Sequence, residues 1–186
     1  MPARFDAAAV ISAAARLSNV PKVVETATKR ALSTLVRDLP PEASRDIRDE
    51  FNLPAKRVND ALSARLVGDA VELSGSGRAI GLAAYGARET SAGVVVTIRK
   101  DQGAVVFRHA FMATPGGRAS STGRQVFERQ LVGGKRAPRY PLDRGFSQNV
   151  AGMLRARARA DRLGNFGLSK LATEIQRNIG VLSGYP

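Results

Sequence analysis

The apolar residues of this chain change their spacing part-way along it, and this change constrains the fold more than any other feature. From Asp6 to Leu39 they recur every three or four positions, as on one face of a helix. The residues of this stripe are Val20, Val23, Val24, Ala27, Ala31, Leu35 and Leu39. Between Val71 and Pro141 the spacing falls to two, which is the period of a strand with one buried face. The pattern therefore predicts an α+β chain with helices first and strands after them.

Three helices are expected at the front of the chain. Asn19 and Pro21 offer a cap and an early proline for the first helix, and Pro40 with Pro41 should end it. A second helix is expected over residues 42–51, and a third from Ala55 to about Arg65.

The middle of the chain predicts one antiparallel sheet of about four strands, because no connection there is long enough to hold a crossover helix. Two strands are expected from the alternation at Ile80, Leu82 and Ala84 and at Val94, Val96 and Ile98. A turn at 100–103 should lead into a returning strand from Ala104 to Ala113. A mobile Gly- and Ser-rich loop at 114–123 should follow, and then a strand from Gln125 to Leu131 that ends before Gly133 and Gly134. Ser147 should then cap a helix that runs to about Arg162, residues 161–165 should break it, and a last helix should cover Leu168 to Ile179.

Length and composition suggest a single domain over residues 1–186, with a helical front end (1–66), a sheet (71–145) and C-terminal helices (147–186). Hydrophobic residues make up 44% of the chain, but aromatic residues only 5%, and there is no Trp. The core must therefore consist largely of aliphatic side chains and bury little apolar surface per residue. Such a core fits a subunit stabilised by its neighbours in an assembly, and it also fits a modest stand-alone domain.

Catalysis, cofactors and metals are not expected. The chain has no Cys and a single His, His109, so thiolate or histidine metal sites cannot form. Asp101, Glu128 and Asp143 show no paired spacing of the kind a metal-dependent nuclease needs. Gly75, Gly77 and Gly81 have the wrong spacing for a dinucleotide loop. No segment is apolar for the length that a bilayer requires, so we expect a protein made in the cytoplasm that does not contact membranes.

The charge of +13 is concentrated in the second half of the chain. Residues 1–100 carry 15 Lys or Arg against 11 Asp or Glu, and residues 101–186 carry 14 against 5. Two groups of basic residues stand out as candidates to face DNA or an acidic partner: Arg155, Arg157, Arg159 and Arg162 in a helix, and Arg118, Arg124, Lys135, Arg136 and Arg139 in loops. The helix arginines spread around the helix, so a simply solvated face is the other reading.

Three segments of the second half resemble, in the same order, the minor tail protein Z family of long-tailed bacteriophages and prophages. They are Ala110 to Ala113 before Gly116 and Gly117, the basic segment Arg124 to Arg129, and Tyr140 to Gln148 leading into a helix. The last segment is close to the family's leucine-proline to glycine-proline-serine run, although Phe146 stands where a proline is common. With the helical start, the similarity covers roughly residues 20–155.

The resemblance implies a structural virion protein that completes the head-proximal end of a phage tail, at the head–tail junction. It implies a homo-oligomeric ring of about six copies around the DNA channel, in contact with tail terminator or tail-tube proteins and with head–tail connector proteins. The ring would contact DNA in the channel without sequence specificity. Expected contacts between subunits are Phe111, Phe127, Tyr140 and Phe146. A free basic protein that binds nucleic acid nonspecifically is the alternative.

Overall fold

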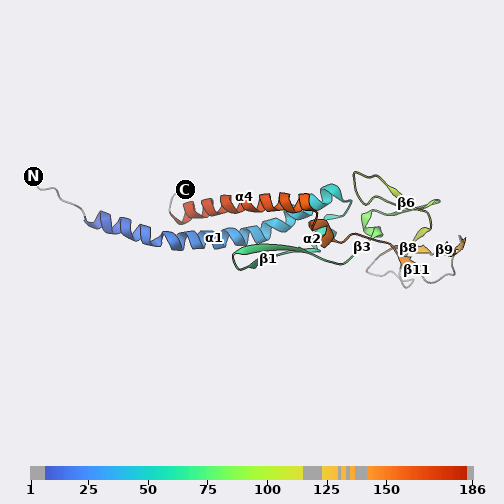
Figure 1. Cartoon of the computed structure of the whole chain (residues 1–186), viewed down its shortest axis with the longest axis horizontal. Helices are drawn as coiled ribbons and strands as arrows, with labels where there is room; N and C mark the ends of the chain where they lie inside the picture. Colours follow the sequence, from blue (N-terminus) through green and yellow to red (C-terminus); the bar gives the residue numbers. More distant parts are fainter. Residues whose placement is uncertain (1–6, 115–122, 130, 133–134, 137–141, 184–186) are drawn as a thin grey trace, which may run out of the picture. The chain divides into compact units, whose positions relative to one another are not determined.

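A computed structural model of the chain describes residues 7–114, 123–129, 131–132, 135–136 and 142–183, with the backbone alone for 7–19, 131–132 and 135–136 (Figure 1). The α+β class is confirmed, with helices at both ends and antiparallel strands in small sheets between them. Residues 115–122 of the mobile loop predicted at 114–123 lie outside the described residues. By its internal contacts the chain divides into two compact units. Unit 1 holds residues 1–38, 65–72 and 164–186, and unit 2 holds 39–64 and 73–163.

The first helix, α1, runs without a break over Ala7–Glu50. The predicted end at Pro40 and Pro41, and the predicted start at Asn19, are therefore wrong. Each proline removes one helical hydrogen bond and crowds the preceding turn. The apolar stripe nevertheless continues across them, with Leu35, Leu39 and Ile47 all buried. Burial on both sides of the prolines offsets their cost, and the predicted second helix is simply the last part of α1.

In unit 1, part of α1 lies beside the C-terminal part of α4, which spans Arg157–Leu182. Ala27, Ala31, Leu32 and Leu35 of α1 are buried in this unit. The predicted break at residues 161–165 does not occur. Gly164 lies inside α4, where a glycine weakens a helix by about 1 kcal/mol without ending it.

The segment after Pro54 holds a short helix and a hairpin instead of the predicted third helix. The helix α2 covers only Ala55–Asn59, and strands β1 (Leu62–Val67) and β2 (Ala70–Gly75) pair with each other. Gly68 begins their two-residue turn with φ +59, while Asp69 keeps a negative φ, as in a type II′ hairpin turn. Arg65 and Glu72 bridge the two strands at 2.8 Å.

Among its described residues, unit 2 contains four small antiparallel sheets, apart from the β1–β2 hairpin, in place of one central sheet. They are β12 (Phe146–Ser147) with β3 (Ile80–Gly81); β4 (Arg88–Thr90), β5 (Gly93–Val96) and β6 (Val105–Phe107); β11 (Leu142–Arg144), β8 (Gln125–Arg129) and β7 (Ala110–Ala113); and β9 (Leu131–Val132) with β10 (Lys135–Arg136). The strand predicted from the alternation at Val94, Val96 and Ile98 is present as β5 but ends at Val96, and the strand predicted from Gln125 to Leu131 is present as β8 but ends at Arg129. The turn predicted at 100–103 is confirmed.

Two of the predicted strands are shorter than expected. The alternation at Ile80, Leu82 and Ala84 is not one strand, because the chain turns into a 3-10 helix, η1, over Leu82–Tyr85. Residues three apart lie on the same side of such a turn, so Leu82 and Tyr85 are both buried. The returning strand predicted at 104–113 is split by a turn at Arg108 and His109, and its halves β6 and β7 join different sheets.

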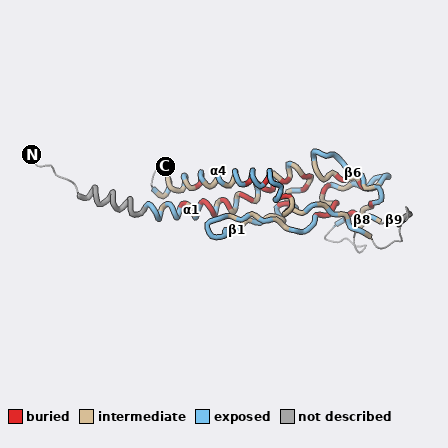
Figure 2. The backbone as a smooth tube through the Cα atoms, viewed as in Figure 1, coloured by how far each residue is buried: buried red, intermediate tan, exposed pale blue. Residues whose placement is uncertain are grey.

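The core of unit 2 gathers residues from the end of α1, the strands and α3, and Figure 2 shows buried stretches among exposed ones in this part of the chain. Most of its side chains are aliphatic, as the composition predicted; its aromatic members with the least exposure are Phe51 and Tyr85. The helix α3 covers Val150–Leu154 and is capped by Asn149, whose side-chain oxygen accepts from the Gly152 amide at 2.7 Å. The predicted cap, Ser147, lies in β12 instead.

Candidate functional site

Arg159 is buried, so it is not one of the surface cations predicted from the sequence. Only 1% of its side chain is exposed. Its guanidinium donates to Asp46 Oδ1 at 3.1 Å, to Glu50 Oε2 at 2.5 Å and to the backbone oxygen of Met153 at 2.6 Å. Every one of these contacts lies within unit 2. The arginine holds the end of α1 against the start of α4 and α3, and it cannot also face DNA or another protein.

Arg162 and Arg99 extend this arrangement into an ion-pair network. Arg162 donates to both oxygens of Asp46, at 2.9 and 2.6 Å. Arg99 lies 2.7 Å from Glu50 and also pairs with Asp101. The hydrogen bond from Arg162, followed by that from Arg159, holds the pKa of Asp46 below its ordinary value, although burial acts in the opposite direction.

The remaining predicted helix arginines, Arg155 and Arg157, are exposed. Neither makes a side-chain hydrogen bond or ion pair with any residue that the structure describes. Among the loop candidates, Arg124 is exposed but pairs with Glu89 at 2.7 Å. Lys135 and Arg136 form β10, of which only the backbone is described. Arg118 and Arg139 lie outside the described residues.

A cavity of about 300 Å³ in unit 2, called here the three-arginine cavity, brings together arginines that are far apart in the sequence. It is lined by Pro54, Arg57, Gly81, Ala83, Ala84, Arg124, Gln125 and Arg144. Sequence analysis had singled out Arg124 but not Arg57 or Arg144. Arg57 lies in the short helix α2 and Arg144 ends the short strand β11, so no local spacing could have linked them.

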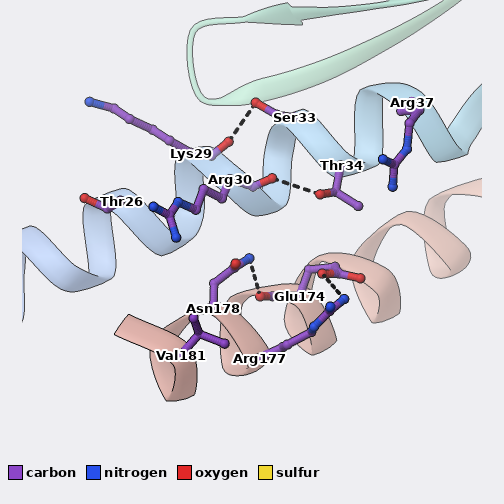
Figure 3. Close-up of a pocket in the computed structure, with 10 residues that line it drawn as sticks. All are labelled: Thr26, Lys29, Arg30, Ser33, Thr34, Arg37, Glu174, Arg177, Asn178 and Val181. Carbon is purple, nitrogen blue, oxygen red and sulfur yellow. Dashed lines mark hydrogen bonds and ion pairs between the residues drawn. The ribbon is translucent and has the colours of Figure 1, made fainter. Parts of the chain in front are cut away.

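A second hollow, of about 700 Å³, lies within unit 1 between α1 and α4 (Figure 3). In Figure 3, Arg30 and Thr34 point from α1 toward α4, and Asn178 points back toward α1. Glu174, which is buried, pairs here with Lys170 at 3.3 Å and with Arg177 at 3.7 Å. Lys29 pairs with Glu25 and Arg37 with Asp38, so three of the four described basic residues that line this hollow have an acidic partner within unit 1.

The candidate contacts between subunits have different surroundings. Phe111 and Phe127 lie opposite each other in β7 and β8, with ring centroids 6.1 Å apart, and the Arg129 guanidinium lies over the Phe111 ring. Phe146 is 51% exposed, with Arg144 above its ring at 5.1 Å. Tyr140 lies outside the described residues. Of the described candidates, Phe146 is therefore the most accessible to a partner.

The structure shows where the few candidate catalytic and metal-binding side chains lie. No three His, Asp or Glu side chains there lie close enough together to hold a metal ion. Asp101 is paired with Arg99, and His109 is exposed in the turn between β6 and β7. Glu128 and Asp143, which show no paired spacing in the sequence, are opposite partners on β8 and β11.

Comparison of the chain with protein-family models, with curated proteins and with solved structures found no match. No helix among the described residues is both long and apolar enough to cross a membrane.

Proposed function

We propose that this chain is a structural virion protein that completes the head-proximal end of a phage tail, as a ring of identical copies around the DNA channel. The observation that carries the proposal is where the three family-like segments lie. Parts of the three segments, Ala110–Ala113, Gln125–Arg129 and Leu142–Arg144, are the neighbouring strands β7, β8 and β11 of one sheet, and Phe146 follows β11 after Gly145. The segments that resemble the tail family in sequence therefore contribute neighbouring strands to the same sheet.

Two further features support a role in assembly. The sheet formed by β4, β5 and β6 ends in β6, whose Val105 and Val106 are 47% and 46% exposed. An edge strand with exposed apolar side chains can accept a strand from a neighbouring chain. Phe146 adds an exposed aromatic ring, a residue type that is enriched at protein interfaces. The expected neighbours are further copies of this chain, tail terminator or tail-tube proteins, and head–tail connector proteins.

Nonspecific binding of nucleic acid outside a virion is the second candidate function. Arg155 and Arg157 favour it, because both are exposed and unpaired among the described residues. The buried Arg159 and the paired Arg162 count against a continuous cationic helix face. Such a protein would lose affinity for arbitrary duplex DNA steeply as salt increases.

The decisive experiment is removal of the chain from a phage that carries it, followed by electron microscopy of the particles. We expect heads and tails that fail to join, and a ring of density at the junction when the chain is restored. Val106→Lys should impair joining, because it places a charge on the β6 edge. Val67→Lys is the matched control, because Val67 is also half exposed but belongs to the β1–β2 hairpin. Normal particles without the chain would contradict the proposal.

A further inference from the structure

We propose that the three-arginine cavity of unit 2 binds a phosphate group. This inference goes beyond the proposed role in the tail and does not depend on it. Among the described residues, the cavity is lined by three arginines and by no acidic residue. Arginine forks match the oxygens of phosphates and can bind them through paired hydrogen bonds.

The contacts of the three arginines leave most of their charge unmatched. Arg57 is exposed, and its side chain makes no hydrogen bond or ion pair with any described residue. Arg144 donates to the side-chain oxygen of Gln125 at 2.6 Å, and this amide carries no charge. Among the described residues, Arg124 alone of the three has an acidic partner, Glu89, which does not line the cavity. Three cations and one carboxylate leave a net excess of two positive charges at this site.

The number and origin of the arginines favour a phosphate over a carboxylate. Arg57 belongs to α2, Arg124 directly precedes β8, and Arg144 ends β11, so the three side chains reach the cavity from separate elements. A carboxylate has two oxygens for such donors. A phosphate has up to four oxygens in a tetrahedral arrangement and up to two negative charges near neutral pH, which match this excess.

Gly81 provides space beside two of these polar groups. A Cβ atom at this position would lie 3.0 Å from Gln125 Oε1 and 3.9 Å from Arg144 Nη2. Gly81 has φ −64, so its backbone does not itself require glycine. Gln125 is buried, which fixes the acceptor that orients the Arg144 guanidinium. A volume of about 300 Å³ is at the small end of ligand sites, as suits a single small group.

The test titrates inorganic phosphate into the pure full-length chain by calorimetry, at constant ionic strength, with acetate as the carboxylate comparison. A short single-stranded oligonucleotide, followed by fluorescence anisotropy, tests whether the phosphate can be a phosphodiester. Arg57→Gln is the main variant, because Arg57 is exposed and unpaired, so its replacement leaves the fold intact. Arg78→Gln is the matched control, since it removes one charge from an exposed arginine of unit 2 outside the cavity.

We expect saturable phosphate binding that weakens about tenfold or more in Arg57→Gln, because a hydrogen bond to a charged group is being lost. Arg78→Gln should change the affinity less than about twofold, because it leaves the cavity intact. Gly81→Ala, which adds bulk without changing charge, should also weaken binding. Oligonucleotide binding with the same dependence on Arg57 identifies a phosphodiester as the source, whereas binding of inorganic phosphate alone identifies a free phosphate. The proposal is overturned if phosphate does not bind, if both arginine variants lose affinity equally, or if acetate binds as tightly.

Discussion

Replacement of Arg159 by Met should destabilise unit 2 strongly. The methionine keeps most of the buried volume and removes the charge. It leaves the Met153 carbonyl without its 2.6 Å donor and takes one partner each from Asp46 and Glu50. Removal of one member of a buried ion pair usually costs about 3–5 kcal/mol, because the other charge stays behind without compensation.

The expected cost here is at the low end, at about 3 kcal/mol, because neither carboxylate is left alone. Asp46 keeps Arg162, and Glu50 keeps Arg99. Their side chains are also 14% and 30% exposed, so water can solvate part of the remaining charge. Arg159→Lys should lie between wild type and Arg159→Met, because a single ammonium keeps the charge but cannot reproduce the planar fork.

Urea unfolding followed by circular dichroism measures this cost. With an m value of about 2 kcal/mol per molar, a loss of 3 kcal/mol lowers the midpoint by about 1.5 M. Hydrogen exchange should locate the loss to the end of α1, around residues 43–50. Arg157→Met is the matched control, because Arg157 is exposed and unpaired, and it should stay within about 0.5 kcal/mol of wild type. An Arg159→Met chain as stable as the control would refute this reasoning, and Arg159 would then be a replaceable core side chain.

Three further predictions concern single positions in unit 2. Because the pKa of Asp46 is lowered in the fold, its stabilisation is complete above its unfolded pKa of about 3.9 and is lost as the pH falls through the folded value. Asp46→Asn should therefore flatten the fall of the urea midpoint below about pH 4, and an unchanged profile would contradict the assignment. Gly93→Ala should cost about 2 kcal/mol or more, because Gly93 has φ +126 and a Cβ there would overlap the carbonyl oxygen of Phe107. Gly77→Ala, with open space and no positive φ, is its control in thermal unfolding and should be nearly neutral. Asn149→Ala should cost about 1 kcal/mol through loss of the α3 cap, and an equal midpoint in urea would show that the cap is dispensable.

The sequence predicted element types better than element ends. Alternation at Val94 and Val96 identified β5, because both side chains point into a core, and such a pattern is local. Pro40 and Pro41 misled the prediction, because their local cost is outweighed by burial of residues on either side. The hairpin that begins at Leu62 was missed for another reason: its turn depends on Gly68 adopting a positive φ.

The candidate sites depended even more on distant contacts. Helical spacing places Arg155, Arg157, Arg159 and Arg162 around one helix but cannot show which of them meets a carboxylate from α1. Arg159 is separated from Asp46 by 113 positions and from Glu50 by 109. The three-arginine cavity likewise joins residues from α2 and the ends of two strands. Only the folded chain shows that Arg159 is structural and that Arg57 lines a cavity.

The uneven charge of the chain has a different meaning once these contacts are known. Part of the positive charge of the second half is paired with carboxylates of the first half. Asp46 pairs with Arg159 and Arg162, Glu89 pairs with Arg124, and Asp38 pairs with Lys170. These pairs hold the fold together within each unit and reduce the number of cations that a polyanion could reach. The net charge still attracts nucleic acid over distance, since that attraction depends on the total. Close contact, however, requires unpaired guanidinium groups, and among the described residues these include Arg57, Arg155 and Arg157. Mutations that aim to remove an interaction with DNA should therefore target these exposed residues, because replacement of Arg159 would destabilise unit 2 instead.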